Sequence, residues 1–133
     1  MNDRFKFRVY DYDDNKMHDV IEIMYRKDNT VVEWLNSKDK KRSAFIGEVP
    51  TVQCTGLKDK NGKLIYQGDI LGDMYEGLYI HYCEHCHQFQ LYSQGYGCMA
   101  CNGDIHWIEV VEDNKKLEVI GNIYENKELL NEI

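Results

Sequence analysis

Apolar and polar side chains alternate through much of the N-terminal half of the chain. Residues 5–12 begin with aromatic and β-branched side chains at every second position and basic side chains between them. A period of two residues is typical of a strand with one buried face. The same pattern predicts strands at 20–25 and 30–35, with short polar turns between them. A polar loop that is rich in basic residues is expected at 36–43.

The second half of the chain has shorter apolar runs, separated by strong turn signals. The dipeptide Asn61-Gly62 supplies the positive φ angles that a tight hairpin turn needs. The chain then turns through Gly68-Asp69 into an apolar strand, which suits either a small, strongly bent β-barrel or an ordinary tight turn. A short helix is expected from Asn126, as its N-cap, to Leu130. The expected strands are residues 51–55, 64–66, 70–71, 78–82, 89–92, 105–111, 117–120 and 122–124.

These elements predict an α+β fold that is mostly β. We expect an N-terminal β-rich subdomain at 1–50 and a second, barrel-like subdomain at 51–133. A chain of 133 residues with 43% hydrophobic residues is large enough to build a core for such an arrangement.

Four of the five cysteines form two C-x-x-C pairs, Cys83 with Cys86 and Cys98 with Cys101, which are separated by eleven residues. Four thiolates at tetrahedral corners suit Zn²⁺ and leave no coordination position for a substrate. The alternatives are four thiols without a metal or a redox pair. A redox pair needs a helix N-terminus to lower the pKa of one thiol, and neither pair precedes a helical pattern. The spacing therefore predicts a zinc ribbon at 83–101 that holds one structural Zn²⁺.

Other groups near the ribbon have plainer interpretations. Four histidines lie in or beside it, and each is interpreted as exposed or packed because four cysteines already complete the shell, although a contribution to metal binding is left open. They are His81, His85, His87 and His106. Cys54 is expected to be a small buried side chain.

The net charge of −7 restricts the partners. A protein that grips duplex DNA usually presents a basic face, and here the only dense basic cluster is Lys38, Lys40, Lys41 and Arg42, interrupted by Asp39. A solvated loop explains that cluster more simply. No apolar run approaches the ~20 residues that span a bilayer, and the charged N-terminus lacks the apolar stretch of a signal peptide. We expect a protein of the cytoplasm that does not associate with membranes.

Three blocks of the sequence together resemble the phage and prophage YopX family. The main block is residues 55–70, TGLKDKNGKLIYQGDI, and the others are residues 5–11, followed by Lys16-Met17, and residues 117–126. The resemblance implies a mostly β protein whose second half is similar to an SH3-like barrel. It also implies a phage or prophage gene expressed inside a bacterium, and it implies no catalytic residues.

The chain departs from the family pattern at two places. The ribbon segment 83–101 is not part of the general pattern and occupies the variable region before the closing strands. Cys54 stands where an aromatic or aliphatic residue is expected.

Three hypotheses for function follow. The first is a non-enzymatic module that binds a host or phage protein, with self-association left open. The second is a nucleic-acid-binding accessory protein, for which a single strand stacked on Phe89, Tyr92 and Tyr96 is favoured over duplex. The third, an enzyme, is disfavoured because no Ser-His-Asp arrangement, phosphate loop or open metal site is evident and Asp69 is interpreted as a turn residue.

Overall fold

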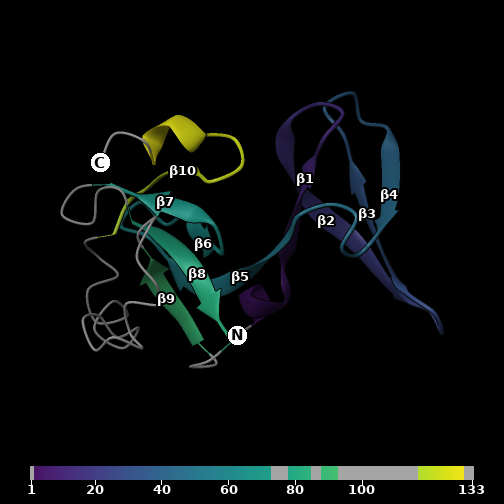
Figure 1. Ribbon diagram of the computed structural model, residues 1–133, viewed down its shortest axis with the longest axis horizontal. Coiled ribbons are helices and arrows are strands. Elements are labelled where there is room, and N and C mark those ends of the chain that lie inside the picture. Colours follow the sequence, from purple (N-terminus) through teal and green to yellow (C-terminus); the bar gives the residue numbers. More distant parts are fainter. Residues whose placement is uncertain (1, 73–77, 85–87, 93–116, 131–133) are drawn as a thin grey trace.

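The computed structural model describes residues 2–72, 78–84, 88–92 and 117–130 (Figure 1). These residues form two antiparallel sheets, one with the strand order β4-β3-β2-β1-β5-β6 and one with the order β10-β7-β8-β9. Short 3₁₀ helices lie near the two ends, η1 at Asn2–Phe5 and η4 at Lys127–Leu129. The strands are β1 (Phe7–Asp11), β2 (Lys16–Tyr25), β3 (Thr30–Leu35), β4 (Lys41–Phe45), β5 (Thr51–Lys58), β6 (Leu64–Tyr66), β7 (Asp69–Leu71), β8 (Tyr79–Cys83), β9 (Gln88–Tyr92) and β10 (Val119–Asn122). The mostly β fold is therefore confirmed.

Strands β1 to β4 form a meander, which we call the N-terminal sheet. Val9, Val32 and Trp34 are buried together on one of its faces. The indole N–H of Trp34 donates to the buried carboxylate of Asp11 at 2.9 Å, so the polar atom of the largest core side chain is satisfied. Sheet pairing and this small core hold the N-terminal sheet together.

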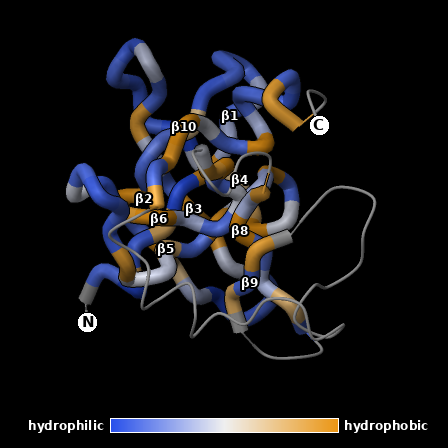
Figure 2. The backbone as a smooth tube through the Cα atoms, turned by 90° about the vertical axis from the view of Figure 1, so that its left-hand side faces the viewer, coloured by the Kyte–Doolittle hydropathy of each residue, from blue (hydrophilic) through white to orange (hydrophobic). Residues whose placement is uncertain are grey.

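Strands β5 to β10 surround a second core, the C-terminal core. Its buried members come from β6, β7, β8 and β9 and from the segment before β10; they are Ile65, Leu71, Ile80, Phe89, Leu91 and Leu117. Residues from both sheets meet in this core, and the small barrel expected for this half stays a prediction. Figure 2 shows hydrophobic stretches, in orange, towards the middle of the molecule and hydrophilic stretches, in blue, in many of the peripheral turns.

A third cluster joins the two parts. Val52, Cys54 and Tyr66 are buried together, and Met17 and Tyr124 pack against them from opposite ends of the sequence. The burial of Cys54 confirms its expected role as a small core side chain, and burial raises the pKa of its thiol. The six-stranded sheet continues past residue 50, because β5 pairs with both β1 and β6. The division at residue 50 stays a prediction.

The expected loop at 36–43 is wrong in its second half, because β4 begins at Lys41. The side-chain oxygen of Asn36 accepts hydrogen bonds from the N–H groups of Lys38 and Lys40, and Asp39 has a positive φ of 59°. These bonds close a tight turn, so the chain returns at once into a strand. Pairing with β3 then outweighs the low strand propensity of a charged segment.

The C-terminal segment also differs from expectation. In place of the expected helix from Asn126 to Leu130, the structure has only the short 3₁₀ helix η4. The side chain of Asn126, at the N-cap position, makes no capping hydrogen bond to it. The side-chain oxygen of Asn126 instead accepts from the N–H of Asn122 at 3.1 Å. The two expected closing strands are one strand, β10, with an irregular register between Val119 and Gly121. The expected strand at 105–111 lies outside the described residues. No helix in the described part of the chain is long and apolar enough to cross a membrane.

Asp59 ties the β5–β6 turn to β10. One carboxylate oxygen accepts from the N–H groups of Asn61 and Lys63, both at 2.9 Å, and the other accepts from the N–H of Val119 at 3.0 Å. Burial alone would raise the pKa of this carboxyl, but the three hydrogen bonds outweigh burial and lower it.

We expect Asp59→Asn to destabilise the protein, because an amide has only one acceptor atom and would turn an N–H group toward a backbone donor. The expected loss is about 1–3 kcal/mol of unfolding free energy, measured by urea denaturation. Asp28→Asn, at an exposed turn, is the control and should unfold like the wild type. Equal midpoints for the two variants would show that Asp59 does not hold this junction.

Candidate functional site

The structure places the first predicted zinc ligand at the end of a strand. Cys83 is the last residue of β8, it is buried, and it pairs with Gln88, the first residue of β9. The connection between the two strands contains Cys86 in the sequence. A C-x-x-C pair at the turn of a hairpin suits metal binding, because both thiolates then lie near the same turn. Cys86, Cys98 and Cys101 lie outside the described residues, so the four-cysteine site stays a prediction.

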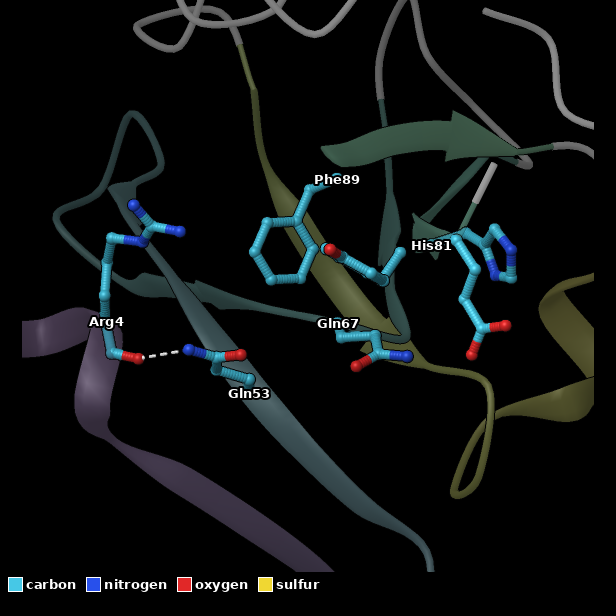
Figure 3. Close-up of a pocket in the computed structure, with 7 residues that line it drawn as sticks. Arg4, Gln53, Gln67, His81 and Phe89 are labelled. Atoms are coloured by element: carbon cyan, nitrogen blue, oxygen red, sulfur yellow. Dashed lines mark hydrogen bonds between the residues drawn. The ribbon is translucent and has the colours of Figure 1, made fainter. Parts of the chain in front are cut away.

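A concavity of about 620 Å³ lies beside this hairpin (Figure 3). In that view, Arg4 and Gln53 lie on one side, His81 lies on the other, and Gln67 and Phe89 lie between them. The side chain of Gln53 donates to the backbone carbonyl of Arg4 at 2.7 Å, which links η1 to β5. The remaining lining residues are Tyr82 and Glu84. This mixture of amide, imidazole, guanidinium and carboxylate groups suits hydrogen bonding to a polar surface.

Phe89 is the only residue of the expected stacking platform whose side chain lies in the described part of the chain. Phe89 is buried in the C-terminal core, and its ring meets the ring of Tyr82 edge-on, with centroids 5.3 Å apart. Because Phe89 is only 6% exposed, its ring offers little surface on which a base could stack. The side chain of Tyr92 and the whole of Tyr96 lie outside the described part of the chain. So do His85, His87 and His106, whereas His81 is half-buried on β8.

A group that the sequence reasoning missed lies on the N-terminal sheet. Asp11, Asp14 and His18 bring their polar atoms within 4.8 Å of one another. His18 bonds to Asp14 at 2.7 Å, and Ser37 donates to the same carboxylate oxygen from its N–H and its hydroxyl. Asp11 accepts from Trp34 and from the N–H of the residue two positions later. These bonds make the group a tie between the β1–β2 turn and the β3–β4 turn.

Hydrogen bonding strongly stabilises the charged form of Asp14. Burial alone would raise the pKa of this carboxyl, but the bonds from Ser37 and His18 lower it to about 2. Sequence reasoning identified the turn residues around Asp14 but could not find Ser37, which is 23 positions away.

Asp69, at the start of β7, is a buried acid in a turn. One of its oxygens accepts from the N–H of Tyr66 at 2.8 Å, which closes the turn through Gly68, whose φ is +88°. Burial raises the pKa of this carboxyl to about 7, although the Tyr66 bond and the positive charges of Arg8 and Lys63 oppose the rise. Arg8 also stacks over the ring of Tyr66 at 4.0 Å and bonds to Asp19 at 3.0 Å.

The basic cluster is partly neutralised by acids. Arg42 forms an ion pair with Asp13, and Lys41 lies 3.8 Å from a carboxylate oxygen of Glu33. Only part of the cluster's formal charge is therefore available to a polyanion, which weakens the case for duplex binding.

Comparison with known proteins identifies the family of this chain and a similar solved structure. The family model described as YopX protein matches residues 6–131. This chain belongs to the YopX family. The crystal structure of protein EF1440 from Enterococcus faecalis is similar to it, with 25% identity and a TM-score of 0.55. That similarity covers 94% of this chain and 96% of the other. A search of curated proteins finds no match.

Residues 55–70, the main block of family resemblance, which we call the YopX hallmark, have a structural explanation here. Asp59 and Asp69 both use their carboxylates to hold turns, at the two ends of the β6 hairpin region. Their burial and hydrogen bonds account for acidic residues at these positions without a catalytic role.

Asp69 should make stability depend on pH in a defined direction. Its pKa is about 7 in the folded state and near 3.8 in the unfolded state, so the folded state holds a proton that the unfolded state releases between these values. The stabilisation from this proton is full below about pH 4 and is lost as the pH rises to about 7.

We expect Asp69→Asn to gain stability relative to the wild type as the pH rises from 4 to 7, by up to ~4 kcal/mol, since one pKa unit corresponds to ~1.4 kcal/mol. The asparagine stays neutral and retains an acceptor for the N–H of Tyr66. Urea midpoints across this range measure the difference. Asp14→Asn is the control of opposite sign, because Asp14 stabilises the fold above about pH 4 and loses that effect as the pH falls towards 2. A constant offset for Asp69→Asn would contradict the prediction.

Proposed function

We propose that this YopX protein is a non-enzymatic phage or prophage accessory protein that works by binding a host or phage protein. Membership of the family supports a phage-type accessory role. We further propose that a structural Zn²⁺ holds the segment 83–101.

The observation that carries the binding proposal is the concentration of exposed apolar side chains on and beside the N-terminal sheet. Tyr25 is 83% exposed and Phe45 is 48% exposed. Single exposed apolar residues are ordinary. Here they lie on both faces of one small sheet, because Tyr25 shares its face with Ile23, which packs against the core, whereas Phe45 pairs with Val31 on the opposite face. The exposed large apolar residues in this part are Tyr12, Ile21, Tyr25, Leu35, Phe45 and Ile46.

The strand register shows how part of this surface is arranged. Val31 pairs with Met24 on β2 and with Phe45 on β4, so these three side chains form a row across three strands. The next row, which contains Val32, points to the opposite face and into the core. One face of the sheet is therefore the core, and the other carries an apolar row with an exposed aromatic ring at its outer end. Interface centres are enriched in such aromatic side chains.

The alternative function, binding of nucleic acid, rests on the basic cluster at the β3–β4 turn and on β4. Lys38 and Lys40 are exposed there. The ion pairs of Arg42 and Lys41 and the net charge of −7 place this alternative second.

The binding proposal predicts that a double variant, Tyr25→Ser with Phe45→Ser, loses its partner while remaining folded. Exposed positions should shift stability by no more than ~0.5 kcal/mol. The measurement is affinity capture from host or infected-cell lysate after nuclease treatment, with mass spectrometry of the recovered proteins. The control is Ile120→Ser. Ile120 is 42% exposed and lies on β10, outside the N-terminal sheet, so its substitution should not affect recovery.

A protein recovered by the wild type and the control but not by the double variant would support the proposal. Recovery that disappears only on nuclease treatment would favour nucleic acid instead. Equal recovery by all three forms would contradict a role for the N-terminal sheet.

The zinc proposal predicts one Zn²⁺ per chain, measured by native mass spectrometry. Cys98→Ser should lose the metal and increase hydrogen exchange in β8 and β9, because these strands lead into and out of the first C-x-x-C pair. The N-terminal sheet should keep its protection, since its core contains no residue from this region. Cys54→Ala is the control, with full metal content.

Sub-stoichiometric zinc together with four titratable thiols in the folded protein would contradict the metal site. Loss of protection throughout the chain in Cys98→Ser would show instead that the ribbon belongs to the main core.

A further inference from the structure

The outer edge of β4 has a defined set of outward backbone groups. β4 is the last strand of the six-stranded sheet, and its only sheet neighbour among the described strands is β3. The N–H of Ile46 donates to the carbonyl of Thr30, and the N–H of Asn36 donates to the carbonyl of Lys40. In an antiparallel ladder, hydrogen-bonded pairs alternate with pairs that are not bonded to each other. The even-numbered residues of β4 therefore bond to β3, and the odd-numbered ones direct their N–H and C=O groups outwards.

The three odd-numbered residues of β4 are not equivalent. Phe45 is already occupied, because its N–H donates to the carboxylate of Glu48 at 2.8 Å and its carbonyl accepts from the N–H of Glu48 at 3.0 Å. The outward backbone groups of Lys41 and Ser43 have no hydrogen-bond partner in the part of the chain that the structure describes. Both residues are exposed. The edge is therefore open over Lys41–Ser43 and closed at Phe45.

We propose that this open edge binds an extended, acidic segment of a partner protein, which adds a strand to β4. The inference rests on the proposed protein-binding function and names the site and the chemistry of the bound segment. Strand addition uses the outward N–H and C=O groups for affinity and the alternating side chains for specificity.

Charge determines the kind of segment. Lys41 and Arg42 on the open edge are partly neutralised by Glu33 and Asp13, whereas Lys38 and Lys40 lie exposed in the turn before it, on a protein whose net charge is −7. Acidic side chains opposite Arg42 and next to Lys40 would form favourable pairs, while the residues opposite Lys41 and Ser43 lie on the other face. A second copy of β4 would place basic residues against basic residues, which disfavours self-association through this edge.

The neighbouring surface adds an apolar preference. Ser43 and Phe45 are two positions apart on β4, so their side chains share a face of the sheet. A segment residue opposite Ser43 would lie on that face, in the row of Glu33 and Ser43 and next to the row that ends in the exposed ring of Phe45. A nucleic-acid backbone offers phosphate acceptors but no alternating donors, so it does not complement this edge. The segment expected here alternates acidic and apolar side chains.

The test uses the full chain and a fluorescein-labelled heptapeptide pool in which Glu or Asp alternates with Val, Ile or Phe. Anisotropy at physiological salt should show saturable binding to the wild type. Ser43→Pro removes one outward N–H, and an edge strand tolerates proline at a position whose N–H does not belong to the ladder. We expect Ser43→Pro to weaken binding roughly tenfold or more and Ser43→Ala, the matched control, to change it by less than about twofold. Thermal midpoints confirm that both variants fold.

The side-chain contribution has its own test. Lys40→Glu should weaken binding of the acidic pool and improve binding of a matched pool with Lys in place of Glu and Asp. N-methylation of the peptide residues whose backbone N–H groups point towards β4 should abolish binding of the acidic pool. N-methylation of the alternate residues, whose N–H groups point away from β4, should have little effect.

Three results would overturn the proposal: no binding of the acidic pool to the wild type at millimolar peptide, equal binding to Ser43→Pro and Ser43→Ala, or displacement of the pool by a single-stranded oligonucleotide with no effect of Ser43→Pro. Lysate capture that fails for the Tyr25 and Phe45 double variant but survives Ser43→Pro would overturn the edge site and leave the proposed protein-binding function intact. Capture lost in Ser43→Pro but retained in Ser43→Ala would support both.

Discussion

Strand β5 is hydrogen-bonded to β1 on one side and to β6 on the other. The two lobes of the molecule, one built on the N-terminal sheet and one on the C-terminal core, both depend on that double pairing. To serve both lobes, the strand must bend. Its register with β6 is irregular between Cys54 and Lys58, and Gly56, within this stretch, has a φ of +87°. A Cβ atom at Gly56 would lie 2.5 Å from the side chain of Arg4. Only glycine meets both demands, since the conformation strains other residues and η1 packs against the strand at this point.

The residues that follow this bend explain why the YopX hallmark is built of turn residues. The β5–β6 turn is closed by Asp59, and Gly62 within it has a φ of +81°. The β6–β7 turn is closed by Asp69, and Gly68 in it lies 3.2 Å, measured from its ideal Cβ position, from the ring of Tyr124. Asp59 also reaches Val119, so the hallmark fastens the closing strand of the fold. A segment of this kind specifies a chain path, and sequence likeness within it transfers a fold more readily than an activity.

Features that depend on residues close together in the sequence could be predicted from it, whereas features that depend on contacts between distant residues could not. Strand β3 agrees with expectation at Thr30–Leu35, because alternation and apolar content are local properties. The turn at Asn61-Gly62 agrees for the same reason. The β4 strand was missed because its charged residues become a strand only through pairing with β3. The helix after Asn126 was wrong because a contact back to Asn122 uses the capping oxygen.

The candidate sites show the same limit. The cysteine spacing indicates a metal site by itself, because the ligand chemistry is specific to the residue type. The open edge of β4 could not be found in this way, since it depends on which side of a strand a neighbour occupies. The group formed by Asp14, His18 and Ser37 also depends on a contact between two turns.

The predicted zinc site and the proposed docking edge lie in different lobes, as Figure 1 shows for β9 and β4. The core beside the zinc hairpin contains Ile80, Phe89 and Leu91, and the core beneath β4 contains Val9, Val32 and Trp34, with no shared residue. A change at the predicted metal site would therefore reach the first core before the second. Among the described residues, the two parts are joined by β5, by the cluster of Val52, Cys54 and Tyr66, and by the stacked rings of Tyr10 and Tyr124. Along the sheet, β4 is separated from β5 by β1, β2 and β3. Because the two cores share no residue, a change in the part of segment 83–101 that the structure describes removes no contact from the core beneath β4.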